Sequence, residues 1–203
     1  MGIKKFVIGG FETNTYLITK NDRAVIIDPG LNFNSILDEV KNYHIEAILI
    51  THGHVDHIDG CGYIDAPIYV GKDDLINFKD LSRSLYYMSG IRPSYNVDKL
   101  NLIGVNDNET INLDSFTFKA IHTPGHTEGS FCYLYYDNLF SGDTLFNQSI
   151  GRVDFPTGSM KKMKESLKKI ITSFTDDTKV YPGHEDKTTI KNEKKYNMYL
   201  KNL

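Results

Sequence analysis

The sequence contains few cysteines and no long apolar run. Its two cysteines, Cys61 and Cys132, belong to no C-x-x-C pair, and two cysteines cannot form the disulfide framework of a small secreted domain. We therefore expect both to be small buried side chains in a reducing, cytoplasmic protein. The N-terminal stretch MGIKKFVIGGFETNTYLI lacks an apolar segment long enough for a signal peptide, and no later run approaches the length of a membrane span. These absences argue against a secreted or membrane-bound protein.

A strong charge of either sign is also absent. The formal net charge is -3, with 24% charged and 40% hydrophobic residues, which is typical of a globular chain that folds without a partner. Nucleic acid or an anionic membrane would need clustered lysines and arginines, so we expect neither as a partner. The most basic stretch, 161–169, is interpreted as the exposed face of a helix whose buried face carries Met160, Met163, Leu167 and Ile170.

The organisation of the chain indicates one domain, 1–203, since no solenoid repeat or low-complexity linker interrupts it. Its first half predicts strands at 4–8, 15–19, 24–28, 47–51 and 66–70, with a helix at 34–43. Its second half predicts strands at 116–121, 130–136, 138–141 and 179–181, with a helix at 159–173. Residues 80–100 fit no clean period and could form a short helix and loop over a site. Apolar strands alternating with helices predict a sheet covered by helices.

The stretch THGHVDH follows the predicted buried strand and concentrates side chains of the metal-ligand type. Because alternate residues point to one side, His52 and His54 can reach one point, while Asp56 and His57 can turn toward a second. Imidazole nitrogen and carboxylate oxygen are ligands for zinc or iron, and three protein ligands with an open position indicate a catalytic site. We interpret this cluster as metal-binding.

Other histidines and aspartates also follow predicted strands. His126, Asp143 and His184 each lie directly after one, and although each alone is a weak signal, together with the cluster they are strong. Two adjacent ions need a bridge, and a carboxylate such as that of Asp143 can give one oxygen to each. We interpret His44 as a surface residue, and the sequence leaves the role of His122 open.

The stretches THGHVDH, HTPGHT, SGDTLF and YPGHE, in this order and at strand ends, resemble the metallo-β-lactamase superfamily and, within it, the glyoxalase II-like hydrolases. The resemblance covers nearly the whole chain from GFETNTYLI and IIDPG onward. The stretches FNQSIGRVDFPTGS and TTIKNEKKYNMYL are similar to the short bacterial hydroxyacylglutathione hydrolase-like subgroup. The resemblance to the superfamily implies an α/β fold, the αββα sandwich of two mixed β-sheets with helices on the outer faces. It also implies that the site lies at one edge of both sheets.

The resemblance also implies roles for individual residues. The first metal would be held by His52, His54 and His126, the second by Asp56, His57 and His184, with Asp143 bridging them. Two divalent ions are expected, zinc first, with iron or manganese as alternatives. Arg152 stands where the larger glyoxalases have a basic residue that contacts the thiol moiety of the substrate.

Some positions depart from that pattern. Larger glyoxalases carry a C-terminal helical domain that grips glutathione, and this chain ends at Leu203, too early for it. Where they place tyrosines against the thiol, this chain has Asp154 and Asp186. We therefore expect a thioester of a smaller or less acidic thiol in place of a glutathione thioester.

The expected reaction is thioester hydrolysis. Two cations would lower the pKa of a bridging water toward neutrality, and the resulting hydroxide would attack the carbonyl while Asp56 orients it and accepts its proton. The thiolate leaves with little need for a general acid.

Two other functions fit the same residues. A persulfide dioxygenase would bind one iron through His52, His126 and Asp143, and the stretches HTPGHT and GRVDF resemble that class as well. A non-catalytic metal-binding protein would use the tyrosine-rich segment 86–95 as a partner surface. The sequence leaves the acyl group, the thiol, the metal and the oligomeric state undetermined.

Overall fold

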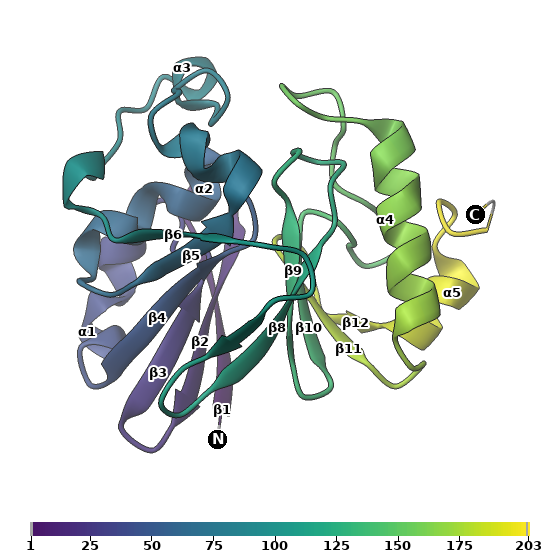
Figure 1. Cartoon of the computed structure of the whole chain (residues 1–203), viewed down its shortest axis with the longest axis horizontal. Helices are drawn as coiled ribbons and strands as arrows, with labels where there is room; N and C mark the ends of the chain where they lie inside the picture. Colours follow the sequence, from purple (N-terminus) through teal and green to yellow (C-terminus); the bar gives the residue numbers. More distant parts are fainter. Residues whose placement is uncertain (1, 202) are drawn as a thin grey trace.

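The computed structural model describes residues 2–201 and 203. Two six-stranded sheets lie face to face, with strand orders β1-β2-β3-β4-β5-β6 and β12-β11-β10-β9-β8-β7. Helices cover the outer face of each sheet (Figure 1). This arrangement confirms the predicted αββα sandwich.

The first sheet contains strands from the N-terminal half of the chain. Its strands are β1 (Gly2–Ile8), β2 (Thr13–Lys20), β3 (Arg23–Ile27), β4 (His44–Ile50), β5 (Ile68–Gly71) and β6 (Leu102–Val105). The first three pair antiparallel, whereas β3, β4, β5 and β6 pair parallel. The parallel strands all point their carboxyl ends at the same edge of the sheet.

The second sheet contains strands from the C-terminal half. Its strands are β7 (Thr110–Asn112), β8 (Thr117–His122), β9 (Phe131–Tyr135), β10 (Asn138–Gly142), β11 (Lys179–Pro182) and β12 (Thr188–Thr189). All neighbours pair antiparallel except β10 and β11, which are parallel. The ends of β8, β10 and β11 therefore meet at one edge.

The helices on the first sheet are short. They are α1 (Leu37–Val40), α2 (Val55–Ile58) and α3 (Tyr86–Ser89), with 3-10 segments η1 (Phe33–Ile36), η2 (Asp59–Tyr63), η3 (Lys72–Phe78) and η4 (Val97–Lys99). The second sheet is covered by α4 (Met160–Ser173) and α5 (Ile190–Tyr196). The Ser159 side chain caps α4 by accepting from Lys162 N, as an N-terminal serine does.

Strand alternation separates the core into layers. In β2, Tyr16 and Ile18 pack between the sheets, while Leu17 packs under the helices of the first sheet. The period of two along a strand produces this division. A third cluster, with Met163, packs α4 against the second sheet. Both cysteines are free and buried, as predicted.

Several predictions about elements were wrong. The helix predicted at 34–43 is one 3-10 segment followed by a single turn, because a segment this short gains little from helix formation itself. Ile36, Leu37 and Val40 pack against the core from this shorter form. Met160 is 40% exposed and lies outside the buried face of α4. Strands β6, β7 and β12 and helix α5 were not predicted; short edge elements carry little periodic signal. Among the described residues, no helix is long and apolar enough to cross a bilayer.

Candidate metal centre

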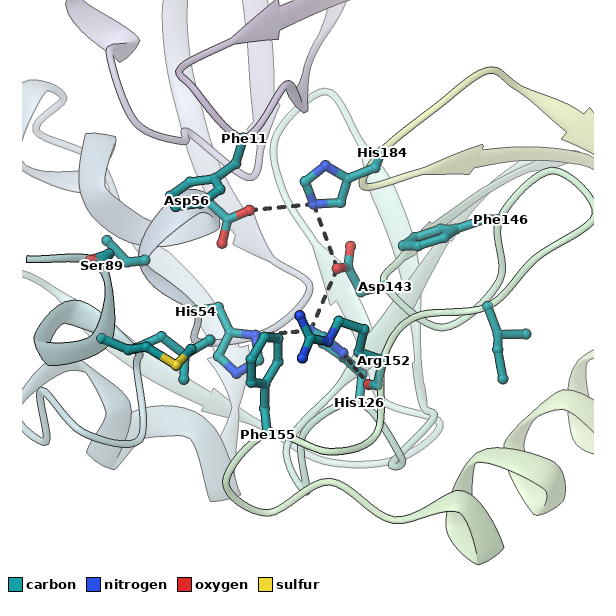
Figure 2. Close-up of a pocket in the computed structure, with 14 residues that line it drawn as sticks. Phe11, His54, Asp56, Ser89, His126, Asp143, Phe146, Arg152, Phe155 and His184 are labelled. Carbon is teal, nitrogen blue, oxygen red and sulfur yellow. Dashed lines mark hydrogen bonds and ion pairs between the residues drawn. The ribbon is translucent and has the colours of Figure 1, made fainter.

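Residues far apart in the sequence meet at the strand edge described above. His52 and His54 follow β4, and Asp56 and His57 lie on α2 directly after them. His126 comes from the loop after β8, Asp143 follows β10, and His184 follows β11. Their side chains converge between the two sheets, as Figure 2 shows for five of these seven residues. The structure thus brings together all seven side chains predicted as ligands.

These side chains form three overlapping groups, in each of which one ligand atom per residue lies within 4.8 Å of the others. The first group is His52, His54 and His126, and the third is Asp56, His57 and His184. The second joins His52, His57 and Asp143. The outer groups correspond to the two predicted metal sites, and the middle group links them through Asp143.

The hydrogen bonding of these residues fits a cation. The Nε2 atoms of His52, His54 and His57 and Oδ1 of Asp143 are buried without a hydrogen-bond partner. Buried polar atoms are almost always paired, so the unpaired atoms of His52, His57 and Asp143, which belong to one ligand group, indicate ligand atoms for an ion. His54 faces the cluster with its Nδ1, which lies 2.8 Å from His126 Nε2. Imidazoles with carboxylates form a donor set suited to zinc, iron or manganese.

Asp143 and Asp56 are surrounded by imidazoles. Asp143 lies 3.5 Å from His57 Nε2 and from His126 Nε2, and 3.6 Å from His184 Nε2. Asp56 Oδ2 lies 3.3 Å from His184 Nε2 and accepts a hydrogen bond from Thr13 Oγ1 at 2.9 Å. The carboxylate of Asp143 therefore has a central position, while that of Asp56 is oriented from one side by β2.

The pKa values follow from this packing. Burial, reinforced by neighbouring imidazoles, lowers the pKa of His52 well below its ordinary value, and burial with His126 beside it does the same for His54. Burial also opposes protonation of His57, but Asp56, Asp28 and Asp143 raise its pKa to about 10. Burial favours the neutral form of Asp56, yet His57 and His184 hold its pKa well below the usual range. The carboxylate is therefore ionised, and the two neutral histidines are free to act as ligands.

A cavity of about 480 Å³ opens above these residues. Its floor contains His54, Asp56, His126, Asp143 and His184. Its walls are mainly apolar, and part of one wall comes from the segment 80–100, through Leu85, Met88 and Ser89. The prediction that this segment lies over a site is therefore confirmed for these residues. The cavity has the size and composition of a small-molecule site.

Comparison with known proteins identifies the family. The model of the metallo-β-lactamase superfamily matches residues 8–184. The chain belongs to this superfamily.

Curated relatives include metal-dependent hydrolases. The chain is 35% identical to an uncharacterised protein of Aquifex aeolicus, over 100% of this chain and 99% of that one. It is 28% identical to the hydroxyacylglutathione hydrolase GloC of Haemophilus influenzae, over 98% of each. It is 32% identical to a probable polyketide biosynthesis zinc-dependent hydrolase, BaeB, of Bacillus velezensis, over 83% and 71%.

Solved structures share the fold closely. BLEG-1, a B3 metallo-β-lactamase, superposes with a TM-score of 0.90 at 31% identity, covering 98% of this chain and 99% of that one. TTHA1623 in a di-iron-bound form gives 0.84 at 29% identity, covering 97% and 100%. ETHE1 from Myxococcus xanthus gives 0.78 at 27% identity, covering 98% and 84%.

Asp28 is a residue of this metallo-β-lactamase site that sequence reasoning missed. It is buried at the end of β3, and its Oδ2 lies 2.9 Å from His57 Nδ1 while also accepting from Thr51 Oγ1 at 2.6 Å. Its Oδ1 accepts from Thr51 N at 2.7 Å. A carboxylate on one ring nitrogen fixes the tautomer and leaves the other nitrogen as the ligand atom. The stretch IIDPG contained the residue, but nothing there indicated its partner.

Asp74 is a second missed residue. From η3 it accepts from Gly53 N at 2.7 Å, from Thr127 Oγ1 at 2.7 Å and from Gly129 N at 3.1 Å. Gly53 separates His52 from His54, and Thr127 follows His126, so Asp74 joins the ligand loops of the two sheets. Burial raises the pKa of Asp74, and these three donors offset only part of that effect.

The remaining predicted residues lie outside the three ligand groups. Arg152 lines the cavity and is exposed, and its carbonyl accepts from His126 Nδ1 at 2.6 Å. Asp154 pairs with Arg152, whereas Asp186 pairs with Lys5 in a separate hollow. Of the two aspartates expected near the thiol of the substrate, Asp186 therefore lies away from the cavity.

Two histidines have other positions. His44 is exposed at the start of β4, as predicted for a surface residue. His122 Nε2 lies 2.8 Å from the Glu128 carbonyl oxygen and its ring stacks on Phe131. Its role is to support the loop that carries His126.

Proposed function

We propose that the protein is a dinuclear metal-dependent hydrolase that acts on thioesters. The observation that carries the proposal is the middle ligand group, in which Asp143 meets one histidine from each of the outer groups. A single-ion site would not need the buried, unpaired Nε2 of His57, together with Asp56 and His184, beside the first group. The names of GloC and BaeB support hydrolysis and, for BaeB, zinc.

In this proposal each metal draws on both sheets. His52, His54 and His126 would hold the first metal, and Asp56, His57 and His184 would hold the second. Asp143 would contact both. Because each set combines loops from both sheets, neither sheet could form the site by itself. We infer that residues 1–203 act as one hydrolase domain.

The chemistry divides between the ions and the chain. Bound divalent cations supply Lewis acidity and bring the pKa of water close to neutrality. Asp56, which is ionised and oriented by Thr13, would accept a hydrogen bond from the attacking water and orient it. Because the pKa of Asp56 lies well below its usual range, the proton that the water loses would pass on to solvent. His126 is oriented by its hydrogen bond to the Arg152 carbonyl, which leaves Nε2 directed at the cluster. The apolar walls limit the access of bulk water to the scissile bond.

Thioesters fit this site because it offers no evident acid for a leaving group. Titratable residues in the cavity floor belong to the proposed ligand sets, and a thiolate needs no protonation to leave. The motif resemblance and the match to GloC support a glyoxalase II-like hydrolase with a small-molecule substrate. We propose that it acts in the cytoplasm. A thiol smaller or less acidic than glutathione is preferred.

The experiment combines metal content with turnover. Protein purified without chelator should contain two ions per chain and hydrolyse acyl thioesters, and both should disappear after chelation and return with zinc, iron or manganese. One iron per chain, with oxygen consumed on a persulfide substrate, would instead support the dioxygenase alternative. The stretches HTPGHT and GRVDF, which resemble that class, keep this alternative in the test.

A further inference from the structure

The two walls above the proposed metal ligands are apolar. Figure 2 shows Phe11 and Ser89 on one side of the ligands and Phe146 on the other. Leu85 and Met88 add apolar surface to the wall formed by α3, and Ile150 and Phe155 add it to the opposite wall. Met88 is 65% and Phe11 51% exposed, and exposed apolar side chains that gather around one cavity are typical of a ligand site.

The cavity has one arginine, and its guanidinium is already occupied. Arg152 Nε donates to Asp154 Oδ1 at 2.9 Å, and Nη2 donates to Oδ2 at 2.7 Å. The same guanidinium lies 4.1 Å from the ring centroid of Phe155. Asp154 therefore presents a carboxylate in the two-point geometry that a substrate carboxylate would use. Among the described residues that line the cavity, no other lysine or arginine is present.

We propose that this site selects uncharged, apolar thioesters. Asp154 pairs with the Arg152 guanidinium in place of an anionic group of the substrate, and Met88 contacts the apolar chain of the substrate. An anionic thiol has to displace Asp154 before it reaches the guanidinium, whereas an apolar group gains contact with both walls directly. This selectivity rests on the proposed function, because the substrates it concerns are thioesters. Arg152, Asp154 and Met88 would determine which thioesters bind.

The apolar part is tested with acyl chains of increasing length on N-acetylcysteamine, which is an uncharged thiol. From acetyl to hexanoyl, which adds four methylenes, kcat/KM of the metal-loaded protein should rise at least about tenfold, because each fully buried methylene strengthens binding about fourfold and the walls bury the chain only in part. The variant Met88→Gln should flatten this increase. Met198→Gln is the matched control, since Met198 is 64% exposed and does not line the cavity. A flat series, or equal slopes for wild type and Met88→Gln, would overturn the proposal.

The charge part compares hexanoyl thioesters of glutathione and of N-acetylcysteamine. Asp154→Asn should raise the ratio of kcat/KM for the glutathione ester over the neutral ester about fivefold, since it frees a cation for an anionic group. Adding Arg152→Ala to Asp154→Asn should remove this gain. Asp137→Asn is the control, because Asp137 is also an exposed carboxylate in an ion pair, with Lys179 at 3.0 Å. An unchanged ratio in Asp154→Asn contradicts the role of Asp154.

Measuring the binding of non-hydrolysable analogues tests the proposed selectivity without requiring hydrolysis. If the wild-type protein with two metals hydrolyses no thioester, the proposed function fails, and the inference is then decided by calorimetry with two non-hydrolysable thioethers. S-hexyl-N-acetylcysteamine should bind wild type more tightly than S-hexylglutathione, and Asp154→Asn should narrow the difference. Equal or tighter binding of S-hexylglutathione by wild type would overturn the inference whatever the activity.

Discussion

The floor and the walls of the cavity are built by different means. Floor residues follow strands of both sheets, are mostly buried, and are oriented by further buried carboxylates such as Asp28 and Asp74. Wall residues come from short helices and connections; Phe11 and Met88 are half or more exposed, whereas Leu85 and Phe146 are buried. A rigid scaffold under exposed loops is how a superfamily can keep one chemistry while changing substrates. We therefore expect changes in the floor to alter turnover and metal binding, and changes in the walls to alter selectivity.

The largest effect should come from removing a floor ligand. His57→Ala should abolish thioester hydrolysis and lower the metal content from two ions toward one, with the fold retained, because the core strands lie behind the ligand loops. The matched control is His44→Ala, which removes an exposed histidine from the start of β4. Circular dichroism, elemental analysis and turnover on the same samples measure the fold, the metal content and the activity. Activity of His57→Ala within a few-fold of wild type would contradict the assignment of His57 as a ligand.

The second effect compares floor and wall directly. Asp143→Asn should lower kcat far more than Arg152→Ala, since the amide cannot bridge two cations through two anionic oxygens. Arg152→Ala should act chiefly on KM, which is the signature of lost uniform binding. Steady-state kinetics on both variants decides it. A collapse of kcat in Arg152→Ala with KM unchanged would place the arginine in the chemical step.

The third effect concerns Asp28. Asp28→Asn replaces an acceptor of three hydrogen bonds with a group that must turn an amide NH₂ toward donors. The free energy of unfolding should fall by about 1–3 kcal/mol, and affinity for the second metal should fall about tenfold to a hundredfold. Chemical denaturation and metal titration measure the two quantities. Unchanged metal affinity together with lower stability would show that Asp28 supports only the fold.

The smallest effect should come from Asp74, which joins the loops without touching a proposed ligand side chain. Asp74→Asn should weaken the first metal about tenfold while leaving the second nearly unchanged, a magnitude typical of outer residues around a metal. Asp73→Asn, an exposed neighbour on η3, is the control. Equal loss at both metals would indicate general loosening of the fold and not a specific link between the loops of His54 and His126.

The sequence predicted much of the site because its signals are local. THGHVDH places four candidate ligands within six positions, and the strand ends before His126, Asp143 and His184 could be seen from apolar runs. Asp28 and Asp74 were missed because their partners lie 29 and 21 residues away, at His57 and Gly53. A single carboxylate in a turn has no local pattern that distinguishes a buried acceptor from a surface residue.

Local periodicity and motif spacing thus determined most strands, helix α4, the superfamily and the candidate ligands. Only the tertiary structure decided that Asp154 pairs with Arg152 while Asp186 pairs with Lys5. Both aspartates appear equivalent in the sequence, each a few residues after a proposed functional position. The loop after β10 turns Asp154 back onto the guanidinium of Arg152. Lys5 lies on β1, which pairs antiparallel with β2, and it meets Asp186 in a hollow away from the cavity. The path of the backbone, which depends on contacts between both sheets, sets which charge faces the cavity.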